Sequence, residues 1–138
     1  MVATRRIRMG SASIGGGGPL ALIAGPCVLE SEAHARSMAE RLLRLASDLG
    51  IPYVFKASYD KANRSSVQGF RGPGLKEGLR ILAAIRRDLG VPVLSDVHAE
   101  TEIAPAAEVL DVIQIPAFLC RQTDFLVAAG KSCRPVNV

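Results

Sequence analysis

Short apolar runs and longer amphipathic stretches alternate along this chain. The first run, at residues 20–24, is continuously apolar, which is typical of a strand buried on both faces of a sheet. Further runs predict strands at 53–55, 93–94, 111–113 and 135–138. Because strands that alternate with helices form parallel sheets with right-handed crossovers, the pattern predicts an α/β fold.

The stretches between these runs have helical periodicity. The first follows Ser31, a favourable N-cap residue, and ends at Gly50. Its predicted apolar stripe consists of Met38, Leu42, Leu45 and Leu49. The second carries one stripe, which consists of Leu75, Leu79, Leu82, Ile85 and Leu89. Two shorter helices are predicted at 101–108, interrupted by Pro105, and at 121–129.

Two segments of the chain are nearly identical. Asp-Leu-Gly-Ile-Pro at 48–52 and Asp-Leu-Gly-Val-Pro at 88–92 each end a predicted helix and lead into a strand, which indicates a repeated supersecondary unit. Before the first unit, residues 5–9 predict a short strand that fits one arm of a hairpin. The Gly-rich segment 10–18 predicts a turn or connector, because it lacks the patterns of phosphate-binding loops.

The composition excludes several classes of protein. A chain of 138 residues with 49% hydrophobic and 22% charged residues is typical of one globular domain. A net charge of +4 with only six aromatic residues disfavours a nucleic-acid surface, and no apolar stretch is long enough to span a membrane. Three cysteines without CxxC spacing argue against a disulfide framework or a zinc knuckle, so we expect a cytoplasmic protein.

Polar, potentially reactive side chains follow each of the first four strands of the predicted sheet. Cys27 follows the first strand, Lys56 the second, Asp96 and His98 the third, and Gln114 the fourth. In parallel α/β folds the carboxyl ends of the strands share one rim, and ligands bind there. The sequence therefore predicts a single ligand site at this rim.

The segment 56–66 concentrates the charge of this rim. Its sequence, Lys-Ala-Ser-Tyr-Asp-Lys-Ala-Asn-Arg-Ser-Ser, combines three cations with short hydrogen-bonding side chains. Ammonium and guanidinium groups form charge-assisted bonds to phosphate and carboxylate, while Asn and Ser suit sugar hydroxyls. A solvated loop has the same composition, but the position after a buried strand favours an anionic, hydroxyl-rich ligand.

Two folds fit the succession of elements. A closed (β/α)8 barrel needs roughly 250 residues, so four units and the start of a fifth make about half of one. A half barrel leaves an unpaired strand edge, and we therefore expect the chain to be one part of a longer catalytic unit. A flavodoxin-like open sheet of five strands fits the length and is the alternative.

Five motifs in chain order resemble those of one family. They are Ile-Ala-Gly-Pro-Cys at 23–27, the segment from Phe55 to Ser66, Gly-Phe-Arg-Gly at 69–72, Ser-Asp-Val-His at 95–98 and Gln-Ile-Pro-Ala-Phe-Leu-Cys-Arg-Gln-Thr-Asp at 114–124. This set resembles the 3-deoxy-D-manno-octulosonate 8-phosphate synthase family. The related synthase that opens the shikimate pathway shares the Gly-Pro-Cys start but carries Lys-Pro-Arg-Thr in its second loop.

The resemblance implies a fold and a reaction. The fold is a (β/α)8 TIM barrel, usually tetrameric, of which this chain supplies a hairpin and Gly-rich turn (1–18) and about four βα units (19–138) as a single domain. The reaction is a transferase condensation of phosphoenolpyruvate with D-arabinose 5-phosphate and water. It gives 3-deoxy-D-manno-octulosonate 8-phosphate and phosphate, for biosynthesis of the lipopolysaccharide inner core.

The resemblance also assigns substrate contacts. Those to phosphoenolpyruvate are Lys56, Lys61 and Gln114. Those to the arabinose phosphate are Asn63, Arg64 and Ser65. Two further residues line the pocket: Asp96 and Arg121. Lys61 and Asp96 are the catalytic candidates, since Lys61 can polarise the aldehyde oxygen or move a proton. Asp96 can hold a sugar hydroxyl, orient a lysine or only cap a strand end.

Cys27 is the candidate metal ligand. A lone Cys after a strand is usually a small buried apolar group. In the family that the motifs resemble, however, Cys at this position marks the metal-dependent class, which implies a divalent ion such as Zn, Fe or Mn. The partner ligands of that class, His, Glu and Asp, correspond to positions beyond residue 138.

Four other residues receive less specific predictions. His98 is expected to cap a loop, and Cys120 and Cys133 to act as packing groups. Arg71 fits a substrate or subunit contact and a plain turn equally well.

Two other functions stay open from the sequence. One is the related synthase that uses erythrose 4-phosphate. The other is an inactive half barrel that binds a phosphosugar or assembles with a partner.

Overall fold

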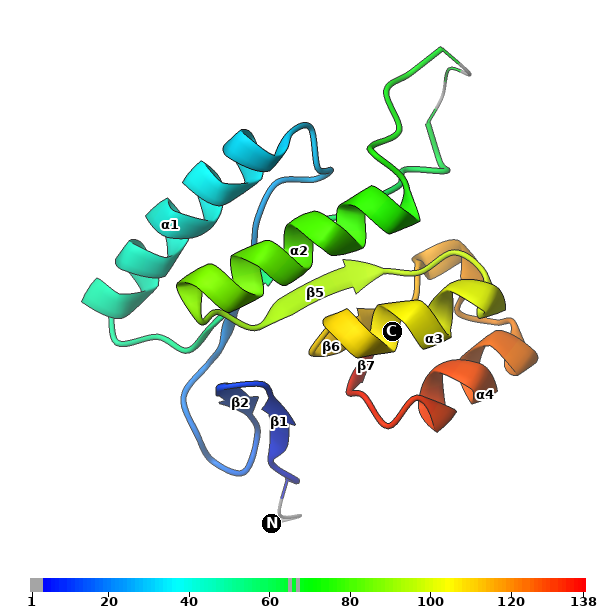
Figure 1. The fold of residues 1–138 in the computed structure, drawn as a ribbon. Helices are drawn as coiled ribbons and strands as arrows, with labels where there is room; N and C mark the ends of the chain where they lie inside the picture. The colour runs from blue at the N-terminus through cyan, green and yellow to red at the C-terminus, as the bar shows by residue number, and fades with distance from the viewer. Residues whose placement is uncertain (1–3, 65, 67) are drawn as a thin grey trace.

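The computed structural model describes residues 4–64, 66 and 68–138, which form an antiparallel hairpin and a parallel α/β unit (Figure 1). The hairpin strands are β1 (Ile7–Met9) and β2 (Ala12–Ile14). The strands of the sheet are β3 (Leu22–Ala24), β4 (Tyr53–Lys56), β5 (Val93–Asp96), β6 (Val112–Gln114) and β7 (Val136–Asn137). The helices are α1 (Glu32–Asp48), α2 (Leu75–Leu89), α3 (Glu100–Val109), α4 (Thr123–Lys131) and the short 3-10 helix η1 (Ala117–Leu119).

The order of the strands decides between the two predicted folds. All neighbouring pairs in the large sheet are parallel, and the order β3-β4-β5-β6-β7 follows the chain. A flavodoxin-like sheet reverses its order at a switch point, so the structure contradicts that alternative. Right-handed crossovers that always step in the same direction place the helices on one face of the sheet, as in a barrel. The fold is that of a partial TIM barrel.

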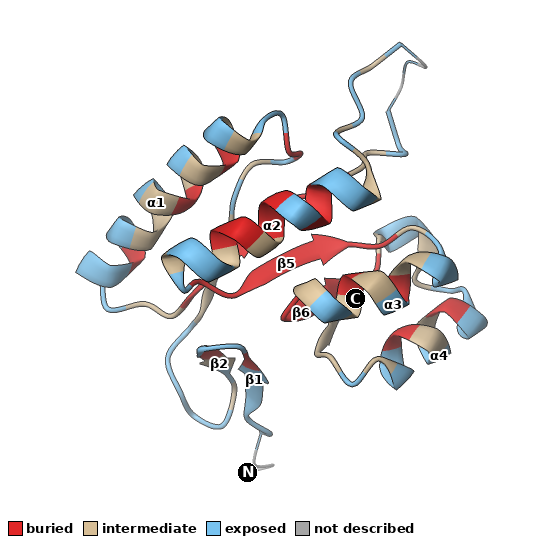
Figure 2. Ribbon diagram, viewed as in Figure 1, coloured by how far each residue is buried: buried red, intermediate tan, exposed pale blue. Residues whose placement is uncertain are grey.

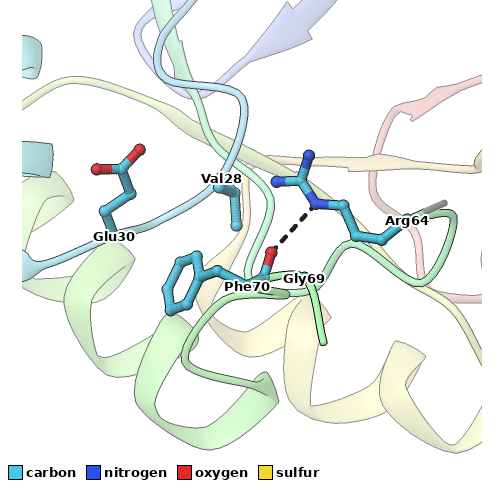
Figure 3. A pocket seen from close by; sticks show the side chains of 5 residues that line it. All are labelled: Val28, Glu30, Arg64, Gly69 and Phe70. Carbon is cyan, nitrogen blue, oxygen red and sulfur yellow. Dashed lines mark hydrogen bonds between the residues drawn. The ribbon is translucent and has the colours of Figure 1, made fainter. Parts of the chain in front are cut away.

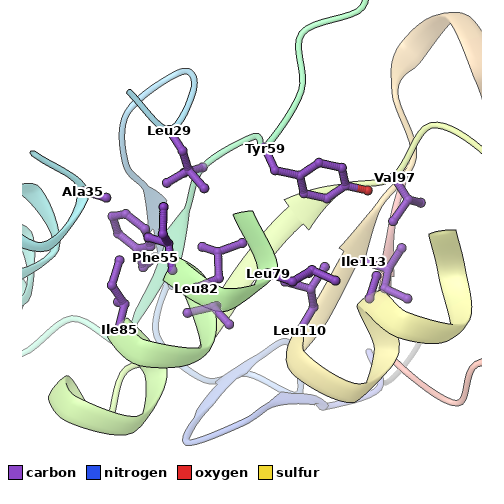
Figure 4. Packing of buried hydrophobic residues seen from close by; sticks show 14 of the residues in the cluster. Leu29, Ala35, Phe55, Tyr59, Leu79, Leu82, Ile85, Val97, Leu110 and Ile113 are labelled. Carbon is purple, nitrogen blue, oxygen red and sulfur yellow. The ribbon is translucent and has the colours of Figure 1, made fainter. Parts of the chain in front are cut away.

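Apolar residues cover both faces of the sheet. On the helix side, Phe55 packs with residues of α2 such as Leu82 and Ile85 in the main core (Figure 4). On the opposite side, a second cluster joins the hairpin to the sheet and consists of Met9, Ala12, Val54, Leu94 and Val112. The hairpin therefore packs against the face of the sheet opposite the helices.

The α1 helix corrects one prediction and confirms another. Ser31 caps it as predicted, since its hydroxyl accepts a hydrogen bond from the His34 amide at 3.1 Å. The predicted stripe is wrong at its end, because Leu45 and Leu49 are 54% and 64% exposed. The buried face is made of small residues, Ala35, Ala39 and Ala46 (Figure 2). Periodicity located an apolar stripe but not the adjacent alanine face that packs inward.

The α2 helix confirms its prediction. The middle of its predicted stripe is buried and both ends pack against the core. It ends at Gly90, whose φ of 65° is the left-handed conformation that glycine adopts without strain.

Three other elements differ from the predictions. Strand β3 is not buried on both faces, because it lies at the edge of the sheet, and Ile23 is exposed. Helix α3 runs through Pro105 without interruption, since its packing against α2 and α4 compensates for one lost hydrogen bond. Residues Ala12–Ile14 form a strand within the segment that was predicted as a turn.

Candidate active site

A polar layer lies above the inner apolar cluster. Side chains alternate along a strand, so Lys56, Asp96 and Gln114 share the face of the apolar residues two positions earlier in β4, β5 and β6. The register places Asp96 opposite Gln114, and Gln114 opposite Asn137 of β7. Asn137 Nδ2 donates to Gln114 Oε1 at 3.0 Å. This bond leaves the NH2 group of Gln114 as the donor for a ligand.

An open pocket of about 640 Å³ lies at this rim. It brings together five residues predicted from the sequence: Lys61, Asn63, Arg64, Asp96 and Gln114. Ala62, His98 and the segment 116–119 complete its lining. Lys56 lies beside it, because its ammonium donates to Ser58 Oγ at 3.1 Å and Ser58 donates to Asp96 Oδ1. The prediction of one shared rim is confirmed for these residues.

Three predicted residues are not placed in this pocket. Arg121 and Cys27 are exposed and are not among its described lining residues. Ser65 lies outside the described residues. Their assignments stay predictions.

Asp96 is the most enclosed ionisable group of the pocket. It is 5% exposed, and both carboxylate oxygens have partners, with His98 Nε2 at 3.1 Å from Oδ2. Burial raises the pKa of Asp96, but hydrogen bonds from His98 and Ser58, with the nearby lysine charges, outweigh it and lower the pKa to about 2. The carboxylate is therefore ionised at neutral pH and is a weak proton acceptor. Its geometry favours the orienting role over proton transfer.

Lys56 and Lys61 form a pair of cations next to this carboxylate. Burial and, after it, the charge of Lys61 lower the pKa of Lys56. Asp96 opposes this shift and helps to keep the ammonium protonated. Two ammonium groups held around one carboxylate leave an excess of positive charge, which suits a dianionic ligand.

An ion pair closes the base of the loop between β4 and α2, which we call the charged loop. Arg71 contacts Asp60 through two bonds, Nε to Oδ1 at 2.9 Å and Nη2 to Oδ2 at 2.6 Å. The Lys61 amide donates to the Arg71 carbonyl at 2.7 Å. Arg71 thus joins the two ends of the loop that carries Lys61 and Arg64, which is a role that the sequence did not distinguish.

Arg64 also lines a second hollow, between the segment that follows β3 and this loop (Figure 3). Its Nε donates to the Phe70 carbonyl at 3.1 Å, and the hollow of about 530 Å³ is also lined by Val28, Glu30 and Gly69. Among the described residues no carboxylate pairs with this guanidinium. A phosphate group can therefore bind its terminal nitrogens.

The contacts that hold Asp96 were not predictable from the sequence. Ser58 was not singled out, and His98 was predicted at the rim and as a loop cap, without a contact to Asp96. The one available signal was the Asp-Val-His spacing, which puts two ionisable side chains on the same face of a strand end. The contact with Ser58 depends on packing between β4 and β5, which periodicity does not give.

The donors for a metal ion are incomplete in this part of the chain. Within residues 4–64, 66 and 68–138, no three His, Cys, Asp or Glu side chains cluster closely enough to hold an ion. The exposed Cys27 thiol is suited to be one ligand of a soft or borderline divalent ion.

Across the same residues, none of the helices is long and apolar enough to span a membrane.

Comparison with known proteins gives the family. The sequence model described as the DAHP synthetase I family matches residues 4–138. The chain belongs to this family. It is 63% identical over 135 residues to the 2-dehydro-3-deoxyphosphooctonate aldolase of Citrifermentans bemidjiense, and 62% and 60% identical to proteins of the same name from Geobacter sp. (strain M21) and Geobacter metallireducens.

These matches cover 98% of this chain and 50% of each of the three relatives. The chain thus spans about half the length of the curated relatives it matches. Their shared name denotes the 3-deoxy-D-manno-octulosonate 8-phosphate synthase. The resemblance to this family that the five motifs indicated is therefore confirmed.

Proposed function

We propose that this member of the DAHP synthetase I family is part of a 3-deoxy-8-phosphooctulonate synthase. The enzyme condenses phosphoenolpyruvate with D-arabinose 5-phosphate and water, and it releases phosphate. The observation that carries the proposal is the rim pocket, where Lys61, Asn63, Arg64, Asp96 and Gln114 meet. The names of the relatives support the same reaction.

The chemistry of the pocket suits this pair of substrates. C3 of the enol phosphate attacks the aldehyde carbon, while C2 gains positive character and accepts water. Both substrates are anionic, so positioning them against their mutual repulsion is a large part of the work. Lys56 and Lys61 neutralise the carboxylate and phosphate of phosphoenolpyruvate, and the Gln114 amide orients the carboxylate without adding charge.

The pentose phosphate is assigned to the charged loop. Arg64 binds its phosphate through the terminal guanidinium nitrogens, while Asn63 and Ser65 bind hydroxyl or phosphate oxygens. Lys61, between the two substrate positions, polarises the aldehyde oxygen. Asp96 stays ionised and holds Lys56, while Arg121 adds a cation to the outer edge of the site.

A divalent ion, Zn, Fe, Mn or similar, is part of the proposal. Cys27 is one ligand, and the remaining donors come from outside the described residues. When bound, such an ion polarises the aldehyde or orients the attacking water. We further propose a cytoplasmic homotetramer.

Product analysis tests the proposal. The purified protein is incubated with phosphoenolpyruvate, D-arabinose 5-phosphate and a divalent metal, and the mixture is analysed by mass spectrometry. We expect an eight-carbon sugar acid phosphate and an equal amount of inorganic phosphate. Absence of both products under all metals tried would contradict the proposal.

A further inference from the structure

Glu102 lies in the first turn of α3, directly behind the rim. One of its carboxylate oxygens, Oε2, accepts a hydrogen bond from the Tyr59 hydroxyl at 2.7 Å and another from the His98 amide at 2.7 Å. The same oxygen lies 3.7 Å from His98 Nδ1. A single side chain of α3 thus contacts the loops that follow β4 and β5.

The His98 ring is held from several sides. The Tyr59 ring packs edge-on against it, with 5.6 Å between centroids and an interplanar angle of 85°. Its Nε2 contacts Asp96 Oδ2 at 3.1 Å, and its Nδ1 is buried without a hydrogen-bond partner among the described residues. Since Nε2 faces the Asp96 carboxylate, the ring carries a proton on Nε2 and donates a hydrogen bond to Asp96.

The charges around His98 favour its protonated form. The hydrogen bond to Asp96 raises the pKa of His98, burial lowers it, and the charges of Asp96, Glu102 and Asp60 raise it further. The cations nearby, Lys56 and Lys61, lie around Asp96. The imidazole therefore lies between the carboxylates of Asp96 and Glu102.

We propose that Glu102 and Tyr59 are positioning residues that hold His98 as a donor to Asp96 and so fix this carboxylate against Ser58 and Lys56. The chain of contacts runs from Tyr59 and Glu102 through His98 to Asp96. Neither Glu102 nor Tyr59 belongs to the substrate contacts assigned above. The effect on turnover rests on the proposed function, whereas the effect on His98 does not.

The chain of contacts gives the expected size of the effect. Without Glu102 the His98 amide and the Tyr59 hydroxyl lose their shared acceptor. The backbone and the aromatic ring that position the His98 imidazole can then shift, and Asp96 loses its oriented donor. Displacement of a catalytic group by about 1 Å costs up to about 100-fold in rate. A partial loss of orientation is therefore expected to lower kcat about 10-fold, with KM less affected.

Two substitutions of Glu102 separate charge from hydrogen bonding. Glu102→Gln keeps an acceptor for Tyr59 and the His98 amide but removes the charge, and Glu102→Leu removes both. The His98 ring is followed by NMR titration in the purified protein, together with steady-state kinetics. We expect Glu102→Gln to lower the His98 pKa and to keep kcat within about 3-fold of wild type. We expect Glu102→Leu to lower both the His98 pKa and kcat.

Controls make each outcome decisive. Glu100→Gln, on the exposed side of the same helix turn, should change neither quantity. An unchanged His98 pKa in Glu102→Gln would overturn the proposal, even if Glu102→Leu does not fold. Wild-type kcat in a folded Glu102→Leu variant would overturn it as well. If the wild type does not consume phosphoenolpyruvate, the proposed function fails, and the titration alone decides the role of Glu102.

Discussion

Asp96 sets the charge balance of the rim at the scale of single residues. A buried carboxylate with hydrogen bonds to both oxygens stays ionised and holds the neighbouring cations in place. The position of Asp96 after a strand was predictable from the sequence. Its contacts with Ser58 and His98 were not predictable, because they arise from side-chain packing between neighbouring strands and loops.

Asp96 should make the stability of the protein depend on acid pH. Folding lowers its pKa from the ordinary value of 3.8 to about 2. The ionised group therefore stabilises the fold by about 2 kcal/mol at neutral pH, and this contribution is lost as the pH falls from about 4 to about 2. Urea unfolding of wild type and Asp96→Asn at pH 6 and pH 2 measures it. We expect the wild-type advantage to shrink at pH 2, and an equal gap at both pH values contradicts the assignment.

Arg64 should bind the pentose phosphate. Removing its charged hydrogen bonds costs about 1.5–3 kcal/mol, so Arg64→Ala should weaken binding of D-arabinose 5-phosphate about 10- to 100-fold. Titration calorimetry measures this, and Arg44→Ala on the exposed surface of α1 is the matched control. Equal affinities in the two variants would remove Arg64 from the site.

At the scale of elements, the sequence predicted which helices and strands exist better than it predicted which face of each helix is buried. Helix α2 has one dominant apolar stripe and a glycine at its end, so its C-terminal end and its buried face were predictable. Helix α1 has two adjacent apolar faces, and the choice between them depends on how closely the helix approaches the sheet. Small alanines permit that approach, and a count of large apolar residues does not detect it.

Gly78 tests the packing of α2 against the loop after β4. A Cβ at this position would lie 2.2 Å from the Tyr59 Cβ, whereas a Cβ at Gly130 in α4 meets nothing within 4 Å. Gly78→Ala should therefore destabilise the protein by about 1–3 kcal/mol through overpacking. Gly130→Ala should stabilise it by up to about 1 kcal/mol, because alanine favours the helix.

Denaturant unfolding of the two glycine variants measures the difference. A Gly78→Ala variant as stable as Gly130→Ala would show that Tyr59 is not held against α2. In that case Tyr59 would also be free to move away from Glu102.

At the scale of the whole molecule, the strand order carries the most information. Periodicity predicted the number and sequence of the strands of the large sheet but left a barrel and an open sheet as alternatives, because it does not say which strands are neighbours. The sequential order settled the fold. It also explains why residues after β4, β5 and β6 meet at one rim.

Metal removal tests the assignment of Cys27. We expect a chelator to abolish turnover and a divalent ion to restore it. Cys27→Ala should weaken metal binding at least about 10-fold, as measured by metal titration. Cys133→Ala, which removes another exposed thiol, should bind metal as the wild type does. Equal metal affinity in both variants would exclude Cys27 as a ligand.

The choice of sugar tests the proposed reaction most directly. The measurement is the initial rate of phosphate release from phosphoenolpyruvate by the purified, metal-loaded protein, with either D-arabinose 5-phosphate or erythrose 4-phosphate as the second substrate. We predict that kcat/KM is higher for the five-carbon sugar. Preference for the four-carbon sugar, or no phosphate release with either, would contradict the proposed synthase.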